Sequence, residues 1–170
     1  MTKLVADTSG LVSLGIVDGS NPAPLSLCLA VYDVFVPIEV LKELKEVASY
    51  NDIHAQAATA VCDRTAELTI QSVDLDAEFP LDDGENAAVT LANEIDAELF
   101  LCDEFNSLGL IHASLANTRL VTTPTLLSVF VRTERLAAAE ALTLLEEMSS
   151  ARSWEANSYV QRARSLLDRS

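Results

Sequence analysis

Lys3-Leu4-Val5-Ala6-Asp7-Thr8-Ser9 is the stretch that decides the fold of this chain. Its short apolar run, Leu4 to Ala6, is typical of a parallel strand that is buried on both faces. Asp7 closes this strand, and the next residues turn the chain into a short helix. Glu98-Leu99-Phe100-Leu101-Cys102-Asp103 repeats the pattern, with Asp103 at the end of a later apolar strand. Because sites in open α/β sheets lie outside the carboxyl ends of the strands, we expect both aspartates at one site.

Strand and helix patterns alternate along the rest of the chain. Further strands are predicted at 34–36, 68–73 and 120–121. Helices are predicted at 25–31, from Pro37, at 53–65, from Asp82, and at 108–115, 126–131, 136–148 and 155–167. This order predicts an α/β fold, a three-layer α/β/α sandwich with a mainly parallel sheet, right-handed crossovers and extra C-terminal helices. Residues 149–153 come nearest to a hinge.

Two glutamates join the aspartates as candidate site residues. Glu43 belongs to the helix opened by Pro37, and its helical phase places it at the edge of the buried face. Glu85 lies in the first turn of the helix that starts at Asp82. Carboxylates gather in folded proteins mainly where a hard cation neutralises them. The four acids therefore predict a Mg²⁺ or Mn²⁺ site, whose commonest use is metal-assisted hydrolysis of phosphodiesters.

Each of these acids also has a plain structural explanation. A strand-end aspartate can cap the next turn, and Glu85 can complement the helix dipole or complete a capping box. Glu43 lies among ordinary solvated charges of its helix. Asp103 and Glu104 are consecutive, so one is expected to point at the site and the other away. The sequence alone leaves open which of the two faces a metal.

Length and composition set the class of protein. The chain has 170 residues, of which 49% are hydrophobic, so we expect one folded domain with a substantial core. No apolar run approaches the roughly 20 residues of a membrane span, and no signal peptide is evident, so we expect a cytoplasmic protein with no membrane contact. Three cysteines without metal-type spacing are expected to be reduced core residues, and two separated histidines argue against zinc.

The charge balance is strongly acidic. The formal net charge is −15, with 26 acidic and 11 basic residues. Such a charge argues against tight nonspecific binding of nucleic acid at ordinary salt. Two explanations remain open, an acidic protein that repels anionic substrates and a halophilic protein adapted to a salty cytoplasm. We favour the second, because the acids are spread through the chain and high salt screens their repulsion.

Four segments in order carry a resemblance to a known family. These are Val5-Ala6-Asp7-Thr8-Ser9-Gly10-Leu11, Val36-Pro37-Ile38-Glu39-Val40-Leu41-Lys42-Glu43-Leu44, Gly84-Glu85-Asn86-Ala87-Ala88-Val89-Thr90-Leu91-Ala92 and Leu99-Phe100-Leu101-Cys102-Asp103-Glu104. Together they resemble the PIN-domain superfamily, and most of all a prokaryotic PIN-like branch of unknown function that is often grouped with VapC-type toxins. The resemblance spans almost the whole chain, including the tail from Trp154 to Val160.

The resemblance implies a doubly wound sheet of about five parallel strands and a metal-dependent single-strand endoribonuclease. It implies a PIN-like nuclease domain over residues 1–148 and a helical tail, 149–170, that packs on or extends it. The catalytic acids would be Asp7, Glu43, Glu85 and Asp103, with Asp7, Glu85 and Asp103 as ligands of Mg²⁺ or Mn²⁺. Partners would be single-stranded or structured RNA, a small antitoxin and a second copy in a homodimer.

One departure from the family pattern concerns a basic residue. The branch often places a basic residue after the acids of the Asp103 region, but Asp103-Glu104-Phe105-Asn106-Ser107-Leu108 contains none. Arg119 and Arg132 are candidate substitutes for the missing phosphate contact.

Two other classes of function compete with the nuclease. A phosphoacceptor signalling domain also has acids at strand ends, but it needs a lysine at a late strand end, and no lysine follows Lys45. A non-catalytic RNA- or antitoxin-binding module on the same scaffold remains the main alternative, because fold alone does not fix activity.

Overall fold

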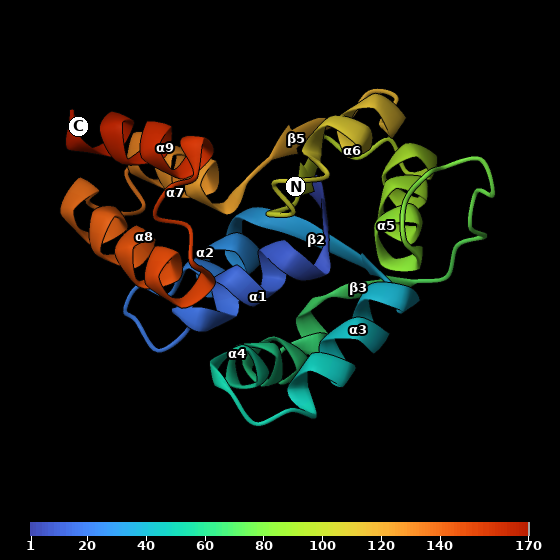
Figure 1. Ribbon diagram of the computed structural model, residues 1–170, viewed down its shortest axis with the longest axis horizontal. Coiled ribbons are helices and arrows are strands. Elements are labelled where there is room, and N and C mark those ends of the chain that lie inside the picture. Colours follow the sequence, from blue (N-terminus) through green and yellow to red (C-terminus); the bar gives the residue numbers. More distant parts are fainter. Residues whose placement is uncertain (170) are drawn as a thin grey trace.

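Five parallel strands form one sheet in the order β3-β2-β1-β4-β5 (Figure 1). The computed structural model describes residues 1–169. The strands are β1 (Thr2–Ala6), β2 (Tyr32–Pro37), β3 (Thr69–Gln71), β4 (Leu99–Leu101) and β5 (Arg119–Val121). Helices pack against both faces, so the predicted α/β/α sandwich with a parallel sheet is confirmed.

The helices lie between the strands and after the last of them. They are α1 (Thr8–Ile16), α2 (Pro24–Val31), α3 (Ile38–Ala48), α4 (Ile53–Cys62), α5 (Asp83–Glu94), α6 (Leu108–Ser114), α7 (Thr123–Arg132), α8 (Ala138–Arg152) and α9 (Ser158–Asp168). A 3₁₀ turn, Thr65–Glu67, precedes β3. None of the helices within residues 1–169 combines the length and apolar character that a membrane crossing requires.

The direction in which the sheet grows reverses beside β1. The chain first builds outward from β1 to β2 and β3, and then crosses back to place β4 and β5 on the other side of β1. Such a reversal leaves a crevice at the carboxyl ends of the two strands that meet there. Ala6 of β1 pairs with Leu101 of β4, so the residues that follow these strands lie next to one another. This reversal fixes where the candidate site lies.

The central strand explains why the opening sequence is so apolar. Leu4, Val5 and Ala6 are all 0% exposed, because β1 has strands on both sides and helices over both faces. Burial of apolar surface contributes about 25 cal/mol per Å². The polar residues Asp7 and Ser9 follow immediately and are also buried, so the apolar strand delivers them into the interior.

Several element boundaries differ from the sequence-based expectation. Pro37 is the N-cap residue of α3 rather than its first helical residue. The helix expected over 53–65 ends at Cys62. Helix α8 continues through Arg152, across the residues expected to form a hinge, and ends at Ser153 with a left-handed φ of 58°. The helix therefore carries Arg152 rigidly to its position.

Candidate functional site

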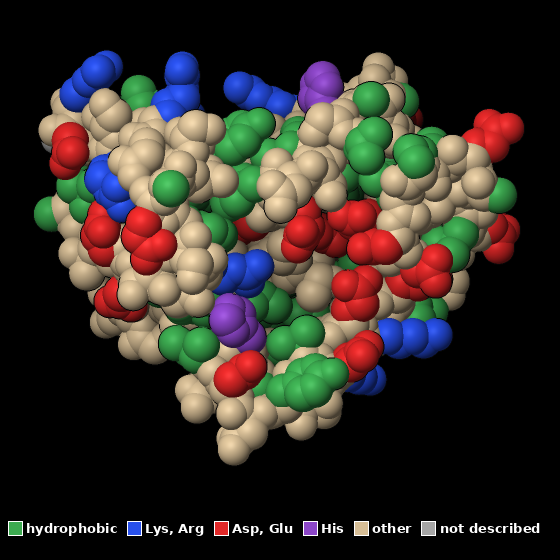
Figure 2. Space-filling view, viewed as in Figure 1, with side chains coloured by type: hydrophobic (Ala, Val, Ile, Leu, Met, Phe, Trp, Pro, Cys, Tyr) green, Lys and Arg blue, Asp and Glu red, His purple; other side chains and the backbone are tan. Residues whose placement is uncertain are grey.

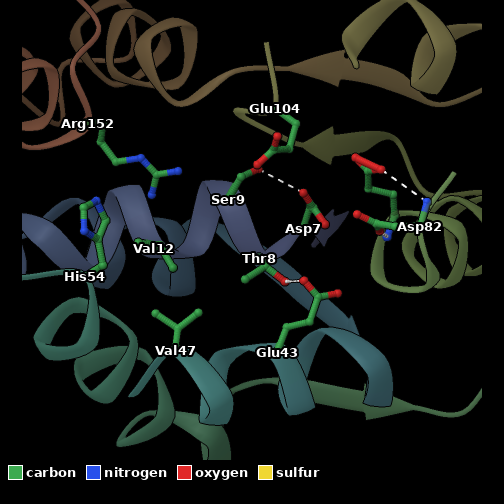
Figure 3. Close-up of a pocket in the computed structure, with 11 residues that line it drawn as sticks. Asp7, Thr8, Ser9, Val12, Glu43, Val47, His54, Asp82, Glu104 and Arg152 are labelled. Carbon is green, nitrogen blue, oxygen red and sulfur yellow. Dashed lines mark hydrogen bonds between the residues drawn. The ribbon is translucent and has the colours of Figure 1, made fainter. Parts of the chain in front are cut away.

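A cavity of about 270 Å³ opens at the carboxyl ends of β1 and β4 (Figure 3). Its walls come from the residues after β1, from α3, α4, α5 and α8, and from the loop after β4. Its lining residues are Asp7, Thr8, Ser9, Val12, Glu43, Val47, His54, Asp82, Glu85, Glu104 and Arg152. Figure 2 shows acidic side chains gathered in and around the hollow at the centre of this face. The fold therefore brings Asp7, Glu43 and Glu85 to one cavity.

Asp7 sits at the floor of the cavity and is held on several sides. It is 3% exposed, and its backbone N–H donates to the Leu101 carbonyl at 2.9 Å. The Ser9 hydroxyl donates to Asp7 Oδ2 at 2.9 Å. The same hydroxyl accepts a hydrogen bond from the Asp103 backbone N–H at 2.9 Å. Ser9 thus ties the end of β1 to the end of β4 and fixes the orientation of the Asp7 carboxylate.

Glu43 reaches the cavity from the middle of α3. The Thr8 hydroxyl donates to Glu43 Oε2 at 3.2 Å. The other carboxylate oxygen lies over Gly84 at the start of α5, so close that a Cβ placed on Gly84 would be 1.5 Å from Glu43 Oε1. The absence of a side chain at Gly84 therefore makes room for the Glu43 carboxylate.

Replacing Gly84 by alanine is expected to push Glu43 out of place with little effect on stability. The obstructing atom is the end of a flexible side chain, so the fold can yield at that point. A catalytic group displaced by about 1 Å can lower a rate a hundredfold. For a metal-dependent reaction that uses Glu43, we expect a rate lowered about tenfold to a hundredfold, with a thermal midpoint close to that of the wild type. Gly109→Ala, at a helical glycine with open space around it, is the matched control.

Glu85 has two roles in the first turn of α5. Its backbone N–H donates to Asp82 Oδ1 at 2.8 Å, and its Oε1 accepts from the Asp82 backbone N–H at 3.4 Å, which completes the capping box. Glu85 is nevertheless 8% exposed and lines the cavity. Glu85 therefore both caps the start of α5 and contributes to the wall of the cavity.

The two consecutive acids after β4 separate as expected. Glu104 lines the cavity, whereas Asp103 does not. Asp103 is 4% exposed, and its Oδ1 accepts a hydrogen bond from the Thr123 backbone N–H at 2.7 Å, at the start of α7. Its Oδ2 is buried and has no hydrogen-bond partner within the described chain. Asp103 thus lies behind the cavity wall with one free acceptor, and Glu104 presents its side chain to the cavity.

Two basic side chains lie on the other side of the cavity, and neither was expected there. Arg152, the last residue of α8, and His54 of α4 face the carboxylates (Figure 3). The Arg152 guanidinium lies 5.8 Å from the centre of the Trp154 ring. Burial lowers the pKa of Arg152, and the negative charges of Asp103, Glu104 and Asp7 oppose that effect. Arg152 supplies the positive charge that the segment after Asp103 lacks; Arg119 and Arg132 line a different pocket.

Burial and mutual repulsion weaken the acidity of the facing carboxyls. Burial raises the pKa of Asp7 to about 6, with a smaller contribution from Glu104. Burial raises the pKa of Glu43 to about 7, and the charges of Asp7 and Asp82 add to the effect. Burial also raises the pKa of Glu85 to about 7, with repulsion from Asp82 and Asp7. These three neighbouring carboxyls are difficult to ionise in the metal-free protein. A bound cation would stabilise their ionised form.

The donors around the cavity suit a hard divalent cation in their chemistry. Carboxylate and hydroxyl oxygens are the ligands that Mg²⁺ prefers, and a dication would relieve the repulsion that raises these pKa values. As they lie, no three His, Cys, Asp or Glu side chains of residues 1–169 are close enough to hold one ion together. The glutamate side chains would therefore have to turn toward a common point on binding.

The raised pKa values predict how the metal-free protein responds to pH. The pKa of Asp7 is about 6 in the folded protein, above its unfolded value of roughly 3.9, so folding favours the protonated form. The resulting cost to stability is absent below about pH 4 and complete above about pH 6. We expect the thermal midpoint in EDTA to fall as pH rises through this window. The difference between wild type and Asp7→Asn isolates this residue, and a pH-independent difference would contradict the assignment.

Comparison with known proteins places the chain in a family. A family model described as a PIN domain matches residues 3–169. No curated protein matches the chain closely enough to count as a relative. PIN domains are generally nucleases that use divalent metals and bind nucleic acids. The match includes Asp7, which follows β1, and helix α8, which carries Arg152 to the cavity. The chain therefore belongs to the PIN-domain family.

Proposed function

We propose that this protein is a Mg²⁺- or Mn²⁺-dependent endoribonuclease that hydrolyses phosphodiester bonds in single-stranded RNA. The observation that carries the proposal is the convergence of Asp7, Glu43 and Glu85 on one cavity in which all three pKa values are raised. Purely structural carboxylates are instead paired with cations or solvated. The ion pairs within residues 1–169 join other residues and involve none of these three acids.

The cavity residues would have different roles in such a site. Asp7, Glu85 and an acid after β4, either Asp103 or Glu104, would hold the metal. When bound, the metal would lower the pKa of a water and stabilise charge on the phosphate. Glu43, oriented by the Thr8 hydroxyl, would complete the shell or position the attacking water. Arg152 would contact a phosphate oxygen from the opposite wall.

The test is cleavage of a mixed pool of single-stranded RNA with Mn²⁺, Mg²⁺ or EDTA. The assay is run both at low salt and in molar KCl, because the acidic composition also led us to propose a salty cytoplasm as the protein's setting. Cleavage that requires the metal supports the proposal. A folded protein that cleaves no RNA under any of these conditions would contradict it.

Arg152→Ala is expected to lower kcat/KM for RNA by about a hundredfold, because the cavity loses its positive wall beside the developing charge. Arg152→Lys keeps the charge but not the planar fork, so we expect a partial recovery. Arg135→Ala, an exposed arginine outside the cavity, is the control. Equal rates for Arg152→Ala and wild type, with equal thermal midpoints, would remove Arg152 from the mechanism.

The biological setting that we propose is a VapC-type toxin–antitoxin pair. A small antitoxin would block the enzyme by inserting into the acidic cavity, where a cationic side chain would meet Asp7, Glu43 and Glu85. A homodimer is also proposed, and the exposed apolar residues Tyr50 and Ile53, at 63% and 49% exposure, support α4 and its preceding turn as a contact. Light scattering of wild type and Ile53→Asp checks the dimer.

A second candidate is a binding module without catalysis. The observation that favours it is that the acids of residues 1–169 do not form a ready group of three around one metal position. RNA binding that is unaffected by Mn²⁺, together with no cleavage, would select this candidate over the nuclease.

A further inference from the structure

A second pocket, of about 460 Å³, lies between the start of β5, helix α7 and helix α9, away from the acidic cavity. Three arginines line it, one from each of these elements: Arg119, Arg132 and Arg162. Tyr159 and Ser128 also line it. Figure 2 shows basic side chains along the edge of the molecule over α9, α7 and β5; acidic side chains surround the central hollow and also lie elsewhere on this face.

The positive charge of this pocket is uncompensated. No aspartate or glutamate lines it, although the whole chain has 26 acidic and 11 basic residues. The ion pairs found in the described chain join Arg64 to Glu67 and Arg164 to Glu146, and none involves the three pocket arginines. In so acidic a protein, three unpaired guanidinium groups at one place constitute a local anion-binding surface.

The floor of the pocket also has an unused polar group. Ser128 is 9% exposed, and its hydroxyl is buried with no hydrogen-bond partner within the described residues. A buried hydroxyl without a hydrogen-bond partner has lost its contact with water and gained nothing in return. A ligand with oxygen acceptors that enters the pocket would supply the missing partner. The orphaned hydroxyl therefore indicates a ligand independently of the arginines.

A ring stack connects this pocket to the acidic cavity. Tyr159 stacks on Phe105, with ring centres 5.6 Å apart and an interplanar angle of 13°. Phe105 directly follows Glu104, which lines the cavity. Tyr159 itself is 49% exposed and lines the pocket, so a ligand there can contact its side chain. A ligand in the arginine pocket would therefore lie beside the segment that forms one wall of the cavity.

We propose that the pocket of Arg119, Arg132 and Arg162 binds backbone phosphates of single-stranded RNA, outside the cleaved position. The ligand's identity rests on the proposed nuclease function. Guanidinium groups match phosphate oxygens, and an exposed tyrosine is a side chain on which an unpaired base can stack. The net charge of −15 repels RNA. An RNA strand is therefore expected to bind where positive side chains locally outweigh that repulsion. An acidic protein segment has the matching negative charge, but it has no nucleobases to stack on Tyr159.

The experiment measures RNA binding without turnover. A labelled single-stranded RNA of about 20 nucleotides is titrated by fluorescence anisotropy in EDTA, over a series of KCl concentrations. The variant is Arg119→Gln/Arg132→Gln/Arg162→Gln. We expect its Kd to rise at least about tenfold, and its log–log salt slope to fall by about 2, because single strands contribute roughly 0.7 per phosphate contact.

The matched control removes the same charge elsewhere. Lys42→Gln/Lys45→Gln/Arg135→Gln changes three exposed basic residues that line neither pocket. Equal weakening in both variants, or no weakening in the pocket variant, overturns the proposal. Poly-glutamate that binds wild type as tightly as the RNA does also overturns it, in favour of an acidic protein partner.

Cleavage assays separate this inference from the nuclease proposal. With Mn²⁺, we expect the pocket variant to cleave a trinucleotide as wild type does and to show a raised KM only for the long RNA. If wild type cleaves no RNA but the pocket variant still loses binding in EDTA, the nuclease proposal fails and the binding site stands. If wild type cleaves and the long-RNA KM is unchanged in the variant, the binding site fails and the nuclease stands.

Discussion

Asp7→Asn is expected to reduce metal-dependent RNA cleavage about a thousandfold, which corresponds to a barrier raised by about 4 kcal/mol. The asparagine keeps the size of the side chain and can still accept from the Ser9 hydroxyl. It removes the negative charge at the floor of the cavity, which a divalent cation requires. Initial rates on single-stranded RNA at saturating Mn²⁺ measure the effect.

The same substitution should leave the fold intact. Since ionised Asp7 is buried and its pKa is raised to about 6, removing the charge relieves a cost that is present at neutral pH. We therefore expect the metal-free variant to melt at a higher temperature than wild type at pH 8. Asp63→Asn, at an exposed aspartate outside the cavity, is the control. Cleavage retained by Asp7→Asn would contradict the proposed mechanism.

Gly15→Ala is expected to destabilise the fold by about 2 kcal/mol. Helix α1 crosses α4 so closely that a Cβ on Gly15 would lie 2.3 Å from the Ala57 carbonyl oxygen and 2.8 Å from its carbonyl carbon. These are backbone atoms of a packed helix, so they cannot rotate away as a side chain could. The two helices would have to separate, which loosens the packing of buried residues on both.

Thermal or urea unfolding measures this effect, with a second glycine as the matched control. Gly109 also lies in a helix but has open space around its Cα, so Gly109→Ala should raise stability by up to about 1 kcal/mol through helix propensity. A shift of about 2–4 °C per kcal/mol is expected for a chain of this size. Equal stability of Gly15→Ala and wild type would show that α1 and α4 can move apart without cost.

The sequence was sufficient for the parts of the fold that depend on local pattern. Short apolar runs ending in Asp7 and Asp103 predicted the two central strands, and both strands were found. Asp82-Asp83-Gly84 predicted the start of α5, because an N-cap acceptor acts within its own helical turn. Boundaries depended on more than local pattern: α8 continues through Arg152, which lines the cavity and lies over the Trp154 ring.

The sequence predicted that Asp7, Glu43, Glu85 and Asp103 would gather at one site; the first three line one cavity, whereas Asp103 does not. Their roles as metal ligands stay a prediction. The periodicity that sets strands and helices is a property of neighbouring residues, and so is the polar residue that ends each strand. These features can therefore be predicted from the amino-acid sequence alone.

Only the tertiary structure decided which side chain after β4 faces the cavity. Glu104 does so because Asp103 is held away by hydrogen bonds from the Thr123 N–H and to the Ser9 hydroxyl, two partners from distant segments. The tertiary structure also decided that Arg152 lines the cavity, and that Arg119 and Arg132, which the sequence offered as candidate phosphate contacts, lie instead with Arg162 in a second pocket. Their positions depend on how α7, α8 and α9 pack, and no local pattern encodes a contact between segments far apart in the chain.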